Sequence, residues 1–443
     1  MFLCYYSCTM DRIAQFFNFK ELDTDLKTEL MAGVTTFATL AYIMVVNPNI
    51  LSAAGMPFGA TMAATIYMAF IGCMLMGLYA NRPFAVAPLL AENAFLVSTV
   101  VLQFGYSWQQ AFGAVAISAI TLFLLTILNI RAWLVNSLPA CIKFAFTAGL
   151  GLYLAFIGLS GAKIVTVSQN SSLAIGNLTD INVLLTIFGV LIIAVLMSKG
   201  VKVAMLAGLV IVTVLSILLG QTSLPQSIFS TPPSLEPVLF KADMAGVLNV
   251  QSIPVIFVVF VLMFVDTMGT MIGVSAKAGF LDKNGNLPDI KRAMICDSSA
   301  TVISSSMSAI TSGVYVESTT GVMAGGRSGL TAVVVGILFL SGLFLSPVFS
   351  IIPSSACNAV LIVIGMLMLA VIKEVNFDDL TDGIPAAVII FLMAFSGNIG
   401  VAVAAGFVLY PILKLVTGKK DALNVPVWIL FVASLIFFGL YNF

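Results

Sequence analysis

Fifteen long apolar stretches, separated by short polar segments, constrain the fold of this chain more than any other feature of its sequence. They lie at about 30–48, 59–80, 84–103, 108–130, 143–160, 181–198, 202–219, 252–275, 293–310, 313–326, 329–350, 357–372, 384–396, 398–416 and 425–441. Apolar stretches of roughly 18 residues or more suit helices that span a bilayer. Charged residues make up 9% of the 443 residues, whereas a soluble domain carries roughly a quarter. The sequence therefore predicts an all-α polytopic membrane protein.

The lysines and arginines test this segmentation, because cytoplasmic loops carry an excess of them. With the N-terminus placed inside, every second loop is basic, and of the 19 basic residues only Lys163 and Lys241 fall outside. Arg131 is counted here as a loop residue. The first fourteen stretches are therefore predicted to cross the cytoplasmic membrane, with the N-terminus in the cytoplasm. The last stretch, 425–441, is either a fifteenth crossing or a helix that lies against the bundle.

Fourteen crossings divide into two sevens, and an odd number per half makes the second half enter the membrane from the opposite side. The first and eighth stretches begin near 30 and 252, and the third and tenth near 84 and 313. These similar offsets predict a 7+7 inverted repeat, which is common among transporters.

The third and tenth stretches are broken, the third by Pro88 and polar residues and the tenth by glycines. Broken backbone at membrane depth is tolerated only where it is buried in protein or lines a cavity. We expect 84–88 and 313–316 to be extended and to pair as a small antiparallel ladder. The half-helices that follow are expected to point their N-termini, with free N–H groups, toward the membrane centre.

Three carboxylates, Glu92, Asp266 and Glu317, lie inside apolar stretches, where an acid is costly and marks a functional site by default. The chain has no histidine, so a carboxylate is the natural carrier of any transported proton. Two simpler alternatives are that Asp266 bonds neighbouring helices and that Glu92 caps its own half-helix. Asp297 is expected to be a helix cap, a partner of Arg292 or a site residue. Arg327 is expected to tether the tenth segment rather than to bind substrate.

The sequence does not favour an enzyme, because it offers no histidine, no paired cysteines and no phosphate-binding glycine loop. Cys4 and Cys8 lack the further ligands that a metal site needs, so neither a metal nor a cofactor is expected. The formal net charge of zero and the absence of a basic run give no reason to expect nucleic acid.

Three motifs stand out: Thr35-Thr36-Phe37 through Tyr42-Ile43 and Asn47-Pro48, FVDTMGT at 264–270, and YVESTTGVMAGGRSGLTAVV at 315–334. They resemble the purine permeases of the AzgA-like branch of the nucleobase cation symporters. The resemblance implies a core domain, 30–130 with 251–350, and a gate domain, 131–250 with 351–443. It also implies import of hypoxanthine, guanine or adenine together with protons.

Carried over residue by residue, the family's binding acids match Asp266 and Glu317, and its amide in segment three matches Asn93. The family commonly has proline followed by glycine-methionine-glycine-leucine-asparagine, where this chain reads PLLAEN at 88–93. Two glycines are lost and Glu92 is gained. Since fewer glycines leave less room for backbone to approach a flat ring, the purine preference cannot be transferred.

The residue types suit a purine, whose N–H donors a carboxylate can accept and whose acceptors a backbone N–H can serve. Phe95, Tyr315, Phe37 and Phe264 are candidates for stacking on the ring. The predicted substrate-binding residues are Asp266, Glu317, Asn93, Glu92, Phe95, Tyr315 and Thr270. Asp266, Glu317 and Glu92 are the candidates for proton coupling. A homodimer is one expected form of the protein.

Two alternatives have the same architecture. A uracil or xanthine permease of the same superfamily is the nearer one. An anion transporter of this fold is less favoured, because its site would need fixed cations or no acids.

Overall fold

The computed structural model describes residues 11–131, 138–167, 173–225, 227–280, 287, 289–308, 311–419 and 423–440. In the middle of helix α11 the side chains of residues 265, 266, 268, 269 and 272 are not part of this description. Cys4 and Cys8, for which no metal is expected, also lie outside the described residues.

Each predicted stretch of the first half is found as a helical segment whose ends lie within a few residues of the prediction. The elements are α2 (Leu26–Leu40), α3 (Ile43–Ser52), α4 (Phe58–Leu78), β1 (Val86–Pro88), α5 (Leu90–Phe95), the π-helix η1 (Leu96–Gln103), α6 (Trp108–Ile127), α8 (Ala140–Gly161), α9 (Ile181–Ser198) and α10 (Ala204–Leu218). A hairpin that the sequence did not predict, β2 (Val165–Val167) with β3 (Leu173–Ile175), lies between α8 and α9.

The second half follows the same order after two short 3-10 turns, η2 (Ala245–Val247) and η3 (Val250–Ser252). Its elements are α11 (Ile253–Ala278), α12 (Ile290–Ser306), β4 (Ser312–Val314), α13 (Ser318–Met323), α14 (Gly329–Ser341), η4 (Gly342–Leu345), α15 (Ser346–Ser350), α16 (Ser354–Leu369), η5 (Ala370–Glu374), α17 (Leu380–Ser396) and α18 (Ile399–Val416). The last stretch is α19 (Val425–Leu440), which packs against α18 and α11.

The predicted fold class is confirmed. Within the described residues, eight helical segments are long and apolar enough to cross a membrane, and further apolar helices are shorter. The two halves repeat the order of long helices, strand and half-helix, and the strands meet in antiparallel sense. The chain is thus a multi-pass membrane protein built as a 7+7 inverted repeat.

The ladder predicted between the two broken segments is present. β1 pairs antiparallel with β4, with Val86 opposite Val314 and Pro88 opposite Ser312. Its backbone bonding extends one step at each end. The N–H of Leu89 donates to the carbonyl of Thr311 over 2.9 Å, and the N–H of Tyr315 donates to the carbonyl of Ala85 over 3.0 Å. Both strands are buried. Extended backbone in an apolar interior needs a partner for its polar groups, and each repeat supplies that partner to the other.

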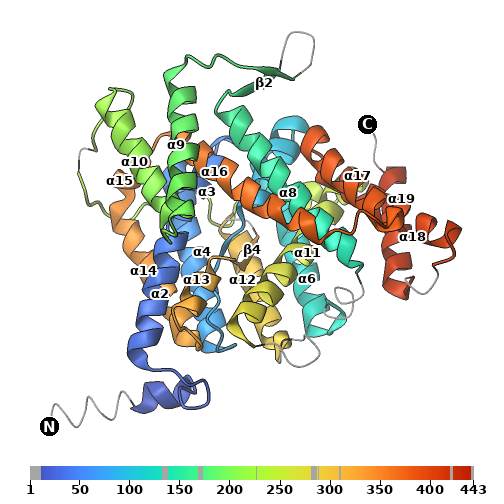
Figure 1. Cartoon of the computed structure of the whole chain (residues 1–443), viewed down its shortest axis with the longest axis horizontal. Coiled ribbons are helices and arrows are strands. Elements are labelled where there is room, and N and C mark those ends of the chain that lie inside the picture. The colour runs from blue at the N-terminus through green and yellow to red at the C-terminus, as the bar shows by residue number, and fades with distance from the viewer. Residues whose placement is uncertain are drawn as a thin grey trace.

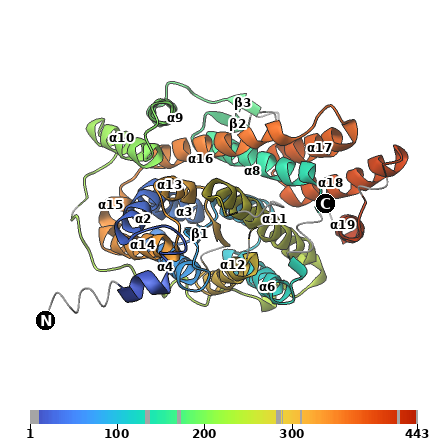
Figure 2. The same cartoon turned by 60° about the horizontal axis from the view of Figure 1, so that its bottom comes forward.

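The helices form two layers (Figure 2). One layer holds α2, α3, α4, α6, α11, α12, α13 and α14 around the ladder, and the other holds α8, α9, α10, α16, α17, α18 and α19. Each layer draws on both repeats, so that α14 packs against α4 in one layer and α16 against α8 in the other (Figure 1). Segments far apart in the sequence therefore lie side by side.

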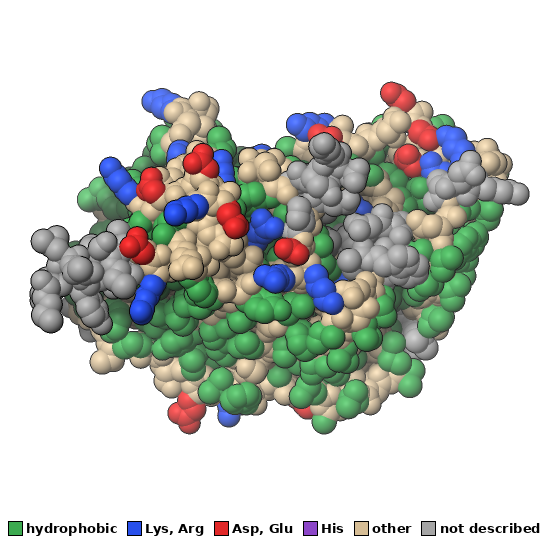
Figure 3. Space-filling view, turned by 90° about the horizontal axis from the view of Figure 1, so that it is seen from below, with side chains coloured by type: hydrophobic (Ala, Val, Ile, Leu, Met, Phe, Trp, Pro, Cys, Tyr) green, Lys and Arg blue, Asp and Glu red, His purple; other side chains and the backbone are tan. Residues whose placement is uncertain are grey.

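The surface is divided in the way that a bilayer requires. Figure 3 shows charged side chains gathered along one edge of the molecule, a broad belt of hydrophobic side chains beneath them, and few charges at the opposite edge. Large apolar side chains are exposed on the helices, among them Leu191, Val416 and Phe395. Such a continuous apolar surface suits contact with lipid acyl chains.

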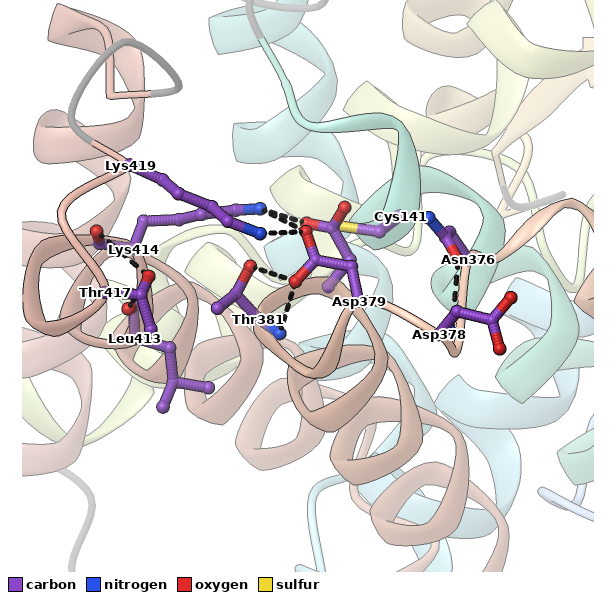
Figure 4. A network of polar contacts seen from close by, with 10 residues as sticks. Cys141, Asn376, Asp378, Asp379, Thr381, Leu413, Lys414, Thr417 and Lys419 are labelled. Atoms are coloured by element: carbon purple, nitrogen blue, oxygen red, sulfur yellow. Dashed lines mark hydrogen bonds and ion pairs between the residues drawn. The ribbon is translucent and has the colours of Figure 1, made fainter.

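A cluster of charges joins the first turn of α17 to the end of α18 (Figure 4). Nζ of Lys414 lies 2.8 Å from Oδ1 of Asp382, and Nζ of Lys419 lies 2.6 Å from Oδ2 of Asp379. Asp379 also caps α17, because its Oδ1 accepts from the N–H and the hydroxyl of Thr381. The bond from Lys419, with those from Thr381, holds the pKa of Asp379 well below its ordinary value. The cluster therefore fixes how α17 and α18 sit against each other.

Candidate functional site

Glu317 occupies the N-cap position of α13, directly after the ladder. The hydroxyl of Tyr42, in the break between α2 and α3, donates to Oε1 of Glu317 over 2.6 Å. One turn further on, the hydroxyls of Thr39 and Thr320 lie 3.1 Å apart. The first segment thus supplies a hydrogen bond to the acid of the tenth segment, through Tyr42, and a second contact to the half-helix that follows it.

Glu92 and Asn93 lie in α5, the half-helix of the third segment, and both are buried. Nδ2 of Asn93 donates to Oδ1 of Asn47 in α3, and Nδ2 of Asn47 donates to the hydroxyl of Thr65 over 2.8 Å. The alternative in which Glu92 caps its own half-helix is wrong, because Leu89 holds the N-cap position and its N–H is already bonded to Thr311.

Asp266 lies near the middle of α11, and its side chain is outside the described part of the chain. The next residue shows how closely this helix approaches the ladder. A methyl group added at Gly313 of β4 would lie 3.0 Å from Oγ1 of Thr267 and 2.8 Å from Cδ1 of Leu89. The hydroxyl of Thr270 donates to the carbonyl of Thr267 over 2.9 Å, within its own helix. The backbone of segment eight is therefore beside the crossing of segments three and ten.

The aromatic candidates all pack against protein in this conformation. The Tyr315 hydroxyl donates to the carbonyl of Pro88, across the ladder, and Phe95 is 1% exposed. Phe37 meets Phe339 edge to face, and Phe264 stacks on Phe260 with ring centres 5.8 Å apart. Stacking of a ligand on any of these rings stays a prediction.

The expectation of free N–H groups at the tenth segment's half-helix is wrong. The N–H groups of Ser318, Thr319 and Thr320 donate to the carbonyls of Tyr315, Val316 and Glu317 over 3.1, 2.9 and 2.9 Å. A turn precedes α13 and uses the donors that an abrupt helix start would leave open. These three N–H groups are therefore not open to acceptors on a ligand.

Asp297 has a different partner from those expected. It lies in the second turn of α12, buried, with its Oδ2 2.9 Å from Nη1 of Arg131. Arg131 follows α6 and is 0% exposed, and its Nη2 donates to the carbonyl of Met263 in α11. Asp297 is thus neither a cap nor a partner of Arg292, and Arg131 is not an exposed loop residue. A count of basic residues per loop cannot reveal such burial, because Arg131 stands at the end of its segment.

Glu29 of α2 is a buried carboxylate that was not among the predicted site residues, and it binds several groups of the motif at 315–334. Its Oε1 accepts from the N–H groups of Arg327 and Ser328 over 2.8 and 3.0 Å, and its Oε2 from the hydroxyl of Thr331. Gly325, with φ +106°, makes the turn that brings these groups round. The motif therefore fastens the tenth and eleventh segments to the first.

Arg327 has the tethering role expected of it. Its Nη1 donates to the carbonyls of Val322 and Gly326 over 2.7 and 2.9 Å. The carbonyl of Val322 belongs to the last turn of α13, where a helix leaves acceptors unsatisfied and favours a cation, and that of Gly326 to the turn that follows it.

Comparison with known proteins identifies the family to which the chain belongs. The sequence profile of a group described as "Permease family" matches residues 27–409. The chain is a member of this permease family. The adenine permease AdeP of Escherichia coli (strain K12) is 39% identical to it over 424 residues, which make up 95% of each chain. The guanine/hypoxanthine permease PbuG of Bacillus subtilis (strain 168) is 36% identical over 434 residues, 96% of this permease and 98% of the relative.

These relatives confirm the purine permease branch to which the motifs assigned the permease. Among solved structures, the transmembrane domain of the cyanobacterial bicarbonate transporter BicA superposes with a TM-score of 0.63 at 17% identity. The match covers 86% of the permease and 97% of that domain. At this identity the likeness shows a shared fold and nothing about the cargo.

Proposed function

We propose that this permease imports a purine nucleobase by proton symport. The observation that carries the proposal is the position of Glu317, whose carboxylate lies at the junction of the two repeats with one oxygen bonded to Tyr42. The names of the relatives, adenine permease and guanine/hypoxanthine permease, support the same cargo.

The chemistry of the junction suits a neutral base. A purine offers ring and exocyclic N–H donors that a carboxylate accepts, whereas an anion would be repelled by acids in an apolar interior. The proposed substrate-binding residues are Asp266, Glu317, Asn93, Glu92, Phe95, Tyr315 and Thr270. Glu317 and Asn93 come from the two paired half-segments, which makes the junction of the repeats the proposed binding site.

Proton coupling follows if the base binds only one protonation state of a buried carboxylate. Asp266, Glu317 and Glu92 are the proposed carriers, in the absence of histidine. The proton then enters and leaves with the base, and collapse of the proton gradient stops accumulation.

The proposed transport cycle is alternating access. Residues 30–130 with 251–350 form a core domain that carries the base, and residues 131–250 with 351–443 form the gate domain against which it rocks. We place the permease in the cytoplasmic membrane with its N-terminus in the cytoplasm, as the distribution of basic residues indicates. Self-association as a homodimer is part of the proposal.

Glu317→Gln tests the proposed function. The change keeps the size of the side chain but removes the charged acceptor, and a hydrogen bond to a charged group contributes about 1.5–3 kcal/mol. Uptake of radiolabelled adenine or hypoxanthine by transport-deficient cells should fall by roughly 10- to 150-fold, at an equal amount of permease in the membrane. Glu236→Gln, at an exposed position, is the matched control. Unchanged uptake by Glu317→Gln would reject the proposal.

Competition by unlabelled guanine, hypoxanthine, adenine, xanthine and uracil, with and without a protonophore, separates the alternatives. Inhibition by the first three and loss of accumulation with the protonophore are expected. Inhibition by uracil and xanthine alone would instead identify a uracil or xanthine permease.

A further inference from the structure

Tyr42 occupies an unusual position in the first segment. Helix α2 ends at Leu40 and α3 begins at Ile43, so Tyr42 lies in the break between them. Its side chain is 1% exposed, and its hydroxyl donates to Oε1 of Glu317, 275 residues further along the chain. A phenol that is buried in this way needs a partner for its hydroxyl, and the acid provides it.

The same segment also reaches the other half-helix. Asn47, on α3, accepts from Nδ2 of Asn93 on α5, while α2 packs along α13. The first segment therefore contacts a polar side chain of each broken segment. Tyr42 contacts Glu317 of the tenth segment, and Asn47 contacts Asn93 of the third. Tyr42 is the contact that involves an acid.

A hydrogen bond at 2.6 Å from a hydroxyl to a carboxylate is of the short, charge-assisted kind. It holds the carboxylate in one orientation, so that Oε2 presents its lone pairs in fixed directions to a ligand. Without the bond, the carboxylate could rotate, and those directions would be lost.

We propose that Tyr42 is a positioning residue that aims Oε2 of Glu317 at one particular N–H of the purine and so determines which ring position the permease recognises. The inference rests on the proposed function. It adds a specificity determinant from segment one to a site otherwise assigned to segments three, eight and ten.

The test uses the purified full-length permease and direct binding of radiolabelled adenine and hypoxanthine. Tyr42→Phe keeps the ring and its packing but removes the hydroxyl, and should weaken binding by about 10- to 100-fold, because a bond to a charged group is lost. Tyr106→Phe is the matched control, since the Tyr106 hydroxyl lies 3.2 Å from the hydroxyl of Ser252 and bonds to no acid in the described part of the chain. The control should bind both bases as the wild type does.

Competition by purines methylated singly at each ring nitrogen supplies the readout that general damage would not give. In the wild type, methylation at one position should abolish competition. In Tyr42→Phe, methylation at that same position should weaken competition less than it does in the wild type, and this change should be larger there than at the other positions.

The outcomes separate the two proposals. If the wild type binds neither base, the proposed function fails and this inference falls with it. If the wild type binds but Tyr42→Phe binds equally well, or weakens all methylated purines by the same factor, Tyr42 has no positioning role. If Tyr42→Phe does not fold, Tyr42→Leu, which also removes the hydroxyl, is judged in the same way: a reduced effect of methylation at that one position supports the inference and an unaltered profile overturns it.

Discussion

The carboxylates that lie among the apolar segments of this permease differ in how many donors the protein offers them. Glu29 accepts from two backbone N–H groups and the hydroxyls of Thr24 and Thr331, and Asp297 is paired with the guanidinium of Arg131. Among the side chains that the structure describes, Glu317 accepts from the hydroxyl of Tyr42 alone. An acid with many donors is held for structure, whereas an acid with one neutral donor keeps capacity for a ligand or a proton. This difference distinguishes Glu317, which is partly exposed, from the buried Glu29 and Asp297.

The pair of Arg131 and Asp297 gives a prediction about stability. Arg131→Met leaves a buried carboxylate without its cation, which typically costs about 3–5 kcal/mol, and the midpoint of thermal unfolding in detergent should fall accordingly. The double variant Arg131→Met with Asp297→Leu removes both charges and should recover most of the loss. Equal midpoints for the single and double variants would show that the pair does not couple.

At this scale, sequence predicts costly residues but not their partners. Glu317 was predicted because an acid in an apolar stretch is conspicuous. Tyr42 and Asn47 lay within a recognised motif but received no role, because their partners are 275 and 46 residues away. Glu29 and Arg131 stand at the ends of apolar stretches, where charges are ordinary, so nothing in the sequence marked them as buried.

The ladder holds the two half-helices of the site, and at Gly313 its packing leaves no room for a side chain. Gly313→Ala would bring a methyl group to 2.8 Å from Leu89 and 3.0 Å from Thr267, so the strand or α11 must shift. Such overpacking typically costs about 1–3 kcal/mol, and we expect uptake of labelled purine to fall by roughly 10-fold or more.

Gly273→Ala is the matched control for this change. It lies in the same helix as Thr267, and no described atom comes within 4 Å of the added methyl. Alanine favours a helix over glycine, so the control should keep both uptake and unfolding midpoint. Equal behaviour of the two variants would contradict the account of Gly313.

The elements themselves were largely predictable. Apolar length and the arithmetic of repeats predicted the crossings, and unpaired backbone at membrane depth predicted the ladder. The break at Tyr42, the π-helix η1 and the hairpin of β2 and β3 were not predicted. Ser98 and Thr99 of η1 contact Tyr153 of α8 and the carbonyl of Gly397. Contacts between segments so distant in the chain leave no local signal in a sequence.

The two layers of the whole molecule are joined by hydroxyl groups at η1. The Tyr153 hydroxyl, from α8, bonds to Ser98 and lies 3.1 Å from Oγ1 of Thr99. Thr99 Oγ1 also donates to the carbonyl of Gly397, between α17 and α18, over 2.6 Å. π-Helical turns occur frequently at functional sites. In the proposed rocking motion, these are bonds that must break.

Thr99→Val should therefore loosen the contact between the layers. A hydrogen bond contributes about 1 kcal/mol, so the backbone amides of residues 96–103 should exchange with deuterium several-fold faster. Thr213→Val is the control, because the Thr213 hydroxyl donates to Leu209 in its own helix over 2.7 Å. If mass spectrometry finds the same exchange in η1 for both variants, the bonds do not hold the layers together.

The shared ladder also has a consequence for biogenesis. β1 is synthesised long before β4, so a nascent chain that holds only the first repeat carries a strand whose backbone partner does not yet exist. The insertion machinery must therefore shelter a polar backbone until residue 314 has been made. Two separately expressed halves could mature only by finding each other within the bilayer, and a chain truncated ahead of β4 would be a natural substrate for membrane proteases.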